Sequence, residues 1–150
     1  MTAGIDRDRT ALRSMLDAWA EALRSKDAEG VVRHQSSDFL QYSLAPPLVS
    51  TAADVPGLNA WFATWEGPIG LELRDLELVI SGDAGFGHCL SRLSGTKVGG
   101  GRDTVWFRQT FGFRRVGGNW KIVHQHESVP FYMDGSDRAA VDLAPESAVA

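Results

Sequence analysis

The sequence predicts an α+β domain in which helices come first and a sheet of long antiparallel strands follows. Apolar residues recur at steps of three and four through residues 6–25, which is typical of an amphipathic helix. From Leu71 onward apolar runs are separated by turn sequences such as Ser81-Gly82-Asp83 and Val116-Gly117-Gly118, as in a meander of hairpins. A length of 150 residues suits one domain, residues 1–150, without internal repeats.

Three helices are expected in the first half. The apolar stripe of the first consists of Leu12, Met15, Leu16, Trp19 and Leu23, and Asp6 or Asp8 can cap its start. Asp27 can cap a second, shorter helix that runs to about Gln35. The third starts at Ser50 or Thr51, with Pro56 near its beginning, and its apolar residues are Leu58, Trp61, Phe62 and Trp65.

Strands are expected at residues 39–44, 71–80, 84–94, 103–115 and 119–128. In the second of these, apolar parity shifts between Leu73 and Leu76, which favours a bulge near Arg74-Asp75. The domain core is expected to cover about 8–133, and residues 134–150 are expected to form a loosely ordered tail.

The bulk composition narrows the setting and the partners. A net charge of -4 without a long basic block argues against nucleic acid. The charged N-terminus does not resemble a secretion signal, and no segment is apolar enough to span a membrane. The single cysteine, Cys89, cannot form an internal disulfide, which suits a reducing cytoplasm. The expected location is therefore cytoplasmic.

The closing strand, residues 119–128, carries the most informative pattern. Trp120, Ile122, His124, His126 and Ser128 alternate and would share one face of an ideal strand. Two imidazoles beside a hydroxyl suit either a polar-tipped pocket or a buried hydrogen-bond network.

The neighbouring strands offer a matching set, if no bulge changes their parity. That set is His88, Arg92, Trp106, Arg108 and Thr110. The opposite face of residues 103–115 holds Phe107, Phe111 and Phe113, which we expect to form the face of a homodimer. The alternative is that these phenylalanines form the core and that the His/Arg face lies outside.

Three segments resemble a known family: Gly87–Thr96, Trp106–Thr110 and Gly118–Phe131. They are similar to the SnoaL-like, or ketosteroid isomerase-like, branch of the nuclear transport factor 2-like superfamily. The resemblance covers roughly residues 8–133. It implies a cone-shaped, cystatin-like fold, in which a curved antiparallel or mixed sheet wraps around three helices with a pocket between them, and it implies frequent homodimers.

Function transfers less readily than fold, because this fold hosts unrelated activities. Steroid isomerisation needs a carboxylate base and an oxyanion hole formed by a Tyr and a protonated Asp. At the position expected for the base this chain has Gln41-Tyr42-Ser43, and Trp106, Arg108 and Thr110 stand where the acid would lie. True steroid isomerase activity is therefore not expected.

The sequence favours a pocket protein for a small, partly apolar molecule, and Arg92 and Arg108 would suit an anionic one. If it is an enzyme, we expect isomerisation, cyclisation or dehydration without a cofactor, with His124 and His126 moving the proton and Arg108 stabilising negative charge. The alternative is a non-catalytic ligand-binding or homo-oligomeric association module. The side chains expected to line the pocket are Tyr42, Trp61, Trp65, His88, Arg92, Trp106, Thr110, Trp120 and Ser128.

A metal site is not expected, although His124-Gln125-His126 could in principle bind zinc with His88 as a third ligand. The nearby arginines would repel a cation. Arg92 and Arg108 can instead hold an anionic ligand or pair with a carboxylate such as Asp38 or Glu66.

Overall fold

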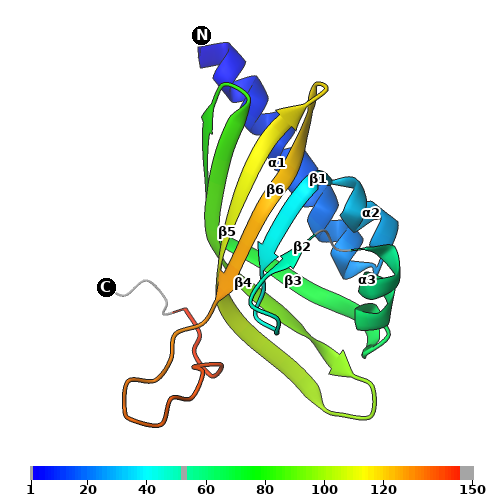
Figure 1. The fold of residues 1–150 in the computed structure, drawn as a ribbon, viewed down its shortest axis with the longest axis vertical. Coiled ribbons are helices and arrows are strands. Elements are labelled where there is room, and N and C mark those ends of the chain that lie inside the picture. Colours follow the sequence, from blue (N-terminus) through cyan, green and yellow to red (C-terminus); the bar gives the residue numbers. More distant parts are fainter. Residues whose placement is uncertain (1, 52–53, 146–150) are drawn as a thin grey trace.

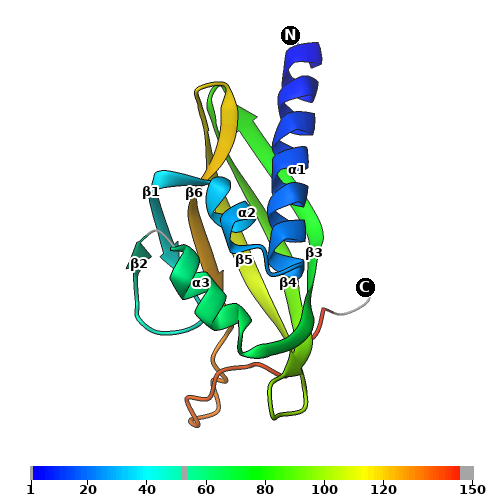
Figure 2. The ribbon, with the colours of Figure 1, turned by 90° about the vertical axis from the view of Figure 1, so that its right-hand side faces the viewer.

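The computed structural model describes residues 2–51 and 54–145. Within them, three helices lie against one side of a curved, unclosed six-stranded sheet (Figures 1 and 2). The helices are α1 (Thr2–Arg24), α2 (Ala28–Arg33) and α3 (Val55–Phe62). The strands are β1 (Gln35–Tyr42), β2 (Ser50–Thr51), β3 (Trp65–Ser81), β4 (Ala84–Lys97), β5 (Arg102–Val116) and β6 (Asn119–Ser128). The predicted α+β fold is confirmed.

The sheet is mixed, with the strand order β2-β1-β6-β5-β4-β3. The long strands β3 to β6 form the expected antiparallel meander. The first strand, β1, runs parallel to the last strand, β6. This pairing brings the segment after α2 beside the closing strand, although some 80 residues separate them in the chain.

The predicted apolar stripe of α1 packs toward the interior, where Leu12 and Leu16 are fully inaccessible.

Aspartate caps mark where the two shorter helices begin. Asp27 caps α2 as predicted, because its carboxylate accepts a hydrogen bond from the Gly30 backbone N–H at 3.0 Å. The expected start of α3 was wrong: Asp54 is its cap, while Ser50 and Thr51 form β2.

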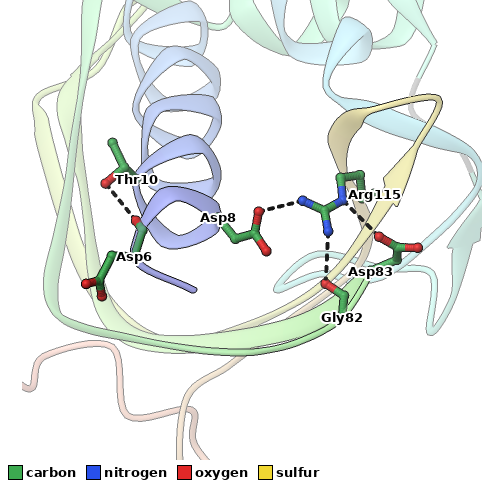
Figure 3. Close-up of polar contacts among 6 residues, drawn as sticks. All are labelled: Asp6, Asp8, Thr10, Gly82, Asp83 and Arg115. Carbon is green, nitrogen blue, oxygen red and sulfur yellow. Dashed lines mark hydrogen bonds and ion pairs between the residues drawn. The ribbon is translucent and has the colours of Figure 1, made fainter. Parts of the chain in front are cut away.

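Arg115, on β5, ties α1 to the β3–β4 turn (Figure 3). Its guanidinium donates to Asp8 at 2.6 Å, to Asp83 at 2.9 Å and to the Gly82 carbonyl. It also lies 4.9 Å from the ring centroid of Trp120. Asp8 was expected as a helix cap, but α1 begins earlier in the chain, so Asp8 lies within the helix and serves this ion pair instead.

One extra residue in β6 inverts the face on which its side chains lie. His124 pairs with Gly112, yet Ile122 pairs with Phe113, so Val123 is the extra residue of a bulge. Before the bulge Ile122 is fully buried against the helices, and after it Gln125 takes the buried side at 3% exposure. The bulge at Val123 was not predicted, whereas the bulge predicted near Arg74-Asp75 is confirmed: the β3–β4 register shifts between Arg74 and Glu77, where Asp75 has a positive φ of 56°.

Two further findings concern the rest of the described chain. None of the helices that the structure describes has the length and apolarity needed to cross a bilayer.

The segment after β6 turns back on itself: Ala140 N–H donates to the Pro130 carbonyl at 2.8 Å, and Ala140 is buried. Part of the expected loose tail is therefore hydrogen-bonded, and residues 146–150 lie outside the described residues.

Candidate functional site

A cavity of about 570 Å³ lies between the helices and the concave face of the sheet. A volume of this size suits a small organic ligand. Trp19 and Leu23 of α1, Leu58 and Trp61 of α3 and Phe107 of β5 give it apolar walls. Polar groups enter the lining from four strands, the β1–β2 loop and the α3 cap, and they are Gln35, Gln41, Ser43, Ser50, Thr51, Asp54, Gln109, Gln125 and Glu127.

Glu127 is the chemically distinctive side chain of this cavity. Gln41 Nε2 donates to its Oε1 at 3.0 Å, and Gln109 Nε2 lies 3.5 Å from its Oε2. Burial raises the pKa of Glu127 to about 7, although the Gln41 amide and the Leu44 backbone N–H favour the charged form. A carboxyl group that is about half ionised near neutral pH can both take and give a proton.

A chain of polar side chains fixes the groups around Glu127. Ser91, fully buried on β4, donates to Gln109 Oε1 at 2.7 Å. Since this oxygen faces Ser91, the amide nitrogen of Gln109 points toward Gln125 Oε1, 3.3 Å away, and toward Glu127. This series of polar contacts ends at Cys89, whose sulfur lies 3.4 Å from Ser91 Oγ. Burial raises the pKa of the Cys89 thiol. A buried thiol with a raised pKa is a poor nucleophile.

Two buried polar atoms of lining residues have no hydrogen-bond partner among the described residues. They are the indole nitrogen of Trp19 and Oε1 of Gln35. A buried polar atom without a partner costs free energy, and both atoms lie within the cavity wall without being exposed to the cavity.

Comparison with known proteins identifies the family. A profile of the SnoaL-like domain matches residues 12–132. The chain belongs to the SnoaL-like family. Among curated proteins, none matches significantly.

Solved structures share the fold. An NTF2-like protein of unknown function from Pseudomonas putida KT2440 is 26% identical, with a TM-score of 0.81 over 93% of this chain and 98% of its own. An NTF2-like protein with a cystatin-like fold from Novosphingobium aromaticivorans is 17% identical, with a TM-score of 0.68 over 90% and 88% of the two chains. A ketosteroid isomerase-like protein from Erwinia carotovora atroseptica is 17% identical, with a TM-score of 0.62 over 79% and 93%. The resemblance to an NTF2-like, cystatin-like fold is thus confirmed.

Most of the residues expected to line the pocket of this SnoaL-like protein lie elsewhere. Of that set only Trp61 lines the cavity, while Trp65 and Trp120 are buried in the core. The remainder lie on the convex outer face of the sheet together with the expected catalytic residues: Tyr42, His88, Arg92, Trp106, Arg108, Thr110, His124, His126 and Ser128. The grouping on one face was right for these nine, but the favoured face was wrong. The alternative holds instead, with the phenylalanines of β5 in the interior and the His/Arg face outside. In β6 the bulge at Val123 separates the two histidines from the face of Trp120 and Ile122.

The outer face has its own contacts. Tyr42 packs edge-on against His124 and His126 at centroid distances of 5.0 and 5.3 Å. His124 Nδ1 lies 2.7 Å from the Leu40 carbonyl, so that nitrogen carries the proton and donates. Arg108 donates to Ser128 Oγ at 3.2 Å. A catalytic role for the histidines stays a prediction, and it would require a substrate on this outer face.

The arginine pairings and the expected dimer face also change. Arg92 pairs with Glu72 at 3.2 Å and lies against Trp106, so neither expected carboxylate is its partner. The phenylalanines of β5 belong to the interior: Phe111 and Phe113 are core residues at 0% and 2% exposure. Phe107 is buried and lines the cavity. These three rings cannot form an exposed dimer face.

No group of three potential ligands among the described residues could hold a metal ion. Sequence reasoning missed Glu127, Gln109 and Gln125, because each has the parity opposite to the histidine or arginine beside it. A usable signal was present in Gly112, since a glycine within a strand often marks a bulge. A Cβ at this position would lie 3.4 Å from both Val123 and His124.

Proposed function

We propose that the protein binds a small, largely apolar molecule in the cavity and moves a proton at carbon, with Glu127 as the acid–base group. One observation carries this proposal: Glu127 lies in a cavity of ligand size, and its pKa is about 7. A perturbed carboxyl group in a cleft is a common property of catalytic sites. Such a reaction would be an isomerisation, a cyclisation or a dehydration, and it requires no cofactor.

The surroundings of Glu127 support this role over a purely structural one. The Gln41 amide holds one carboxylate oxygen, and the Ser91–Gln109 pair fixes the direction of the amide near the other. A general base needs such fixed geometry relative to its substrate. The lining contains no lysine, arginine or histidine among the described residues, so an anionic substrate is disfavoured and Arg108 has no access to the reacting group.

Deuterium exchange at the α-carbon of 2-tetralone, a small apolar ketone, tests the proposal by proton NMR. We expect the wild-type protein to accelerate exchange and Glu127→Gln to lose that acceleration. His126→Gln is a matched control, because it alters the adjacent residue of the same strand but on the outer face. Equal exchange by wild type and Glu127→Gln, or loss of exchange in His126→Gln alone, would contradict the assignment to Glu127.

We also propose that the outer sheet face binds a second copy of the chain. This face carries exposed aromatic side chains, including Phe86 at 48% and Tyr42 at 38% exposure, and aromatic residues are enriched at protein–protein interfaces. Sedimentation at micromolar concentration tests it: a dimer that becomes monomeric on Phe86→Asp supports this interface. A monomeric wild type, or a dimer unaffected by the substitution, would argue against it.

A further inference from the structure

The charges that line the cavity have one sign. Glu127 and Asp54 are its only charged lining residues among those the structure describes. Asp54 lies at the exposed start of α3, whereas Glu127 lies deeper, between β1 and β5. The residues outside the described part include no lysine, arginine or histidine either. The buried carboxylate therefore has no cationic partner within the cavity.

The basic side chains beside the cavity wall are held by backbone carbonyls. Arg24 donates to the Leu71 carbonyl at 2.9 Å, and Lys26 donates to the Trp65 carbonyl at 2.6 Å. Both follow the end of the buried stripe of α1, and neither lines the cavity. An ionised group in a poorly hydrated site is costly unless an opposite charge or hydrogen bonds compensate it. For Glu127, amide and backbone N–H donors supply only hydrogen bonds.

The other features of the lining suit a positive group as well. The rings of Trp19, Trp61 and Phe107 line the same cavity, and indole faces attract cations more strongly than other aromatic rings do.

From this arrangement we infer that the cavity takes an organic amine: a small apolar molecule with a protonated nitrogen that faces Glu127. This inference rests on the proposed function, because it names the ligand class for the same cavity. It goes further in assigning Glu127 the role of counter-charge, a role that proton transfer alone does not require.

Binding of an ammonium group would also prepare the acid–base group. A positive charge beside a carboxyl group favours its ionised form. Glu127, which is about half protonated near pH 7 in the empty cavity, would become a carboxylate in the complex and would thus be in the basic form when the ligand is present. Ligand binding would therefore release protons near neutral pH.

Three probes on one bicyclic scaffold separate the ligand classes: 2-aminotetralin is a cation, 2-tetralol is neutral, and tetralin-2-carboxylate is an anion. Their affinities would be measured by calorimetry near pH 7. We expect the amine to bind wild type at least about tenfold more tightly than the alcohol, because charge-assisted contacts are stronger than neutral ones. The carboxylate should bind most weakly. Glu127→Gln should abolish the preference for the amine, while His126→Gln should retain it.

Equal or tighter binding of the alcohol would overturn the amine inference, and so would tightest binding of the carboxylate. Absence of binding by all three probes would overturn it too. Retention of the amine preference in Glu127→Gln would show that another group carries it and would refute the role given to Glu127. The proposed proton transfer is judged separately, by 2-tetralone exchange and by the titration of the Glu127 carboxyl group in the ligand-free protein, so the two ideas can fail independently.

Discussion

Glu127→Gln should change how the free energy of unfolding depends on pH. Burial raises the pKa of Glu127 from an ordinary 4.5 to about 7, so the folded state holds this proton more tightly than the unfolded chain does. The stabilisation that the bound proton gives is complete below about pH 4.5 and is lost as pH rises through about 7. Glutamine cannot ionise, so the variant should lack this loss.

The size of the effect follows from the two pKa values. A tenfold change in proton affinity corresponds to about 1.4 kcal/mol, so a rise from 4.5 to about 7 gives at most about 3 kcal/mol. Relative to wild type, Glu127→Gln should therefore gain up to about 3 kcal/mol of stability between pH 4.5 and pH 8. Any constant offset from altered hydrogen bonds to Gln41 cancels, because only the change with pH is compared.

Urea unfolding followed by tryptophan fluorescence, at several pH values between about 4.5 and 8, measures this difference. Glu66→Gln is a suitable control, because Glu66 is exposed and its replacement should leave the pH dependence of wild type unchanged. A difference between wild type and Glu127→Gln that stays constant across this range would refute the reasoning. It would show that Glu127 titrates as an ordinary surface carboxyl group.

Two further predictions test the packing. Phe111→Ala should lower the free energy of unfolding by about 3–5 kcal/mol in chemical denaturation, because Phe111 is fully buried. Phe86→Ala, on the outer face, should lower the free energy of unfolding far less. Similar losses in the two variants would contradict the assignment of faces. Asp8→Asn should lower the melting temperature more than Asp83→Asn does, because the Asp8 side chain is 26% exposed and that of Asp83 is 75% exposed, while both pair with Arg115. The reverse order would mean that the Asp8–Arg115 pair stabilises the fold less than the more exposed Asp83–Arg115 pair does.

Much of the fold could be predicted from short-range patterns. The stripe of α1 and the cap at Asp27 were visible because a helix brings residues three and four apart onto one side. The bulge near Asp75 was visible because apolar parity breaks there. The start of α3 was not, because Ser50, Thr51 and Asp54 are all good caps and only pairing of β2 with β1 distinguishes them.

The candidate site was predicted only in part. Alternation correctly placed His88 with Thr110 and His126, which pair across β4, β5 and β6. It could not show that this face is convex and outside. In β6 the error came from one residue: the extra Val123 moves the following side chains to the opposite face, so Glu127 enters the cavity.

The sequence by itself determined the class of fold and its family, because helix periodicity, strand alternation and turn residues are local properties that each segment carries. The tertiary structure alone decided which sheet face meets the helices, and with it the chemistry of the cavity. Both faces of this sheet carry aromatic side chains, and the packing of the helices against residues such as Ile122 and Phe111 makes one face the interior. That selection leaves the histidine pair on the surface and places the Glu127 carboxyl group in the cavity.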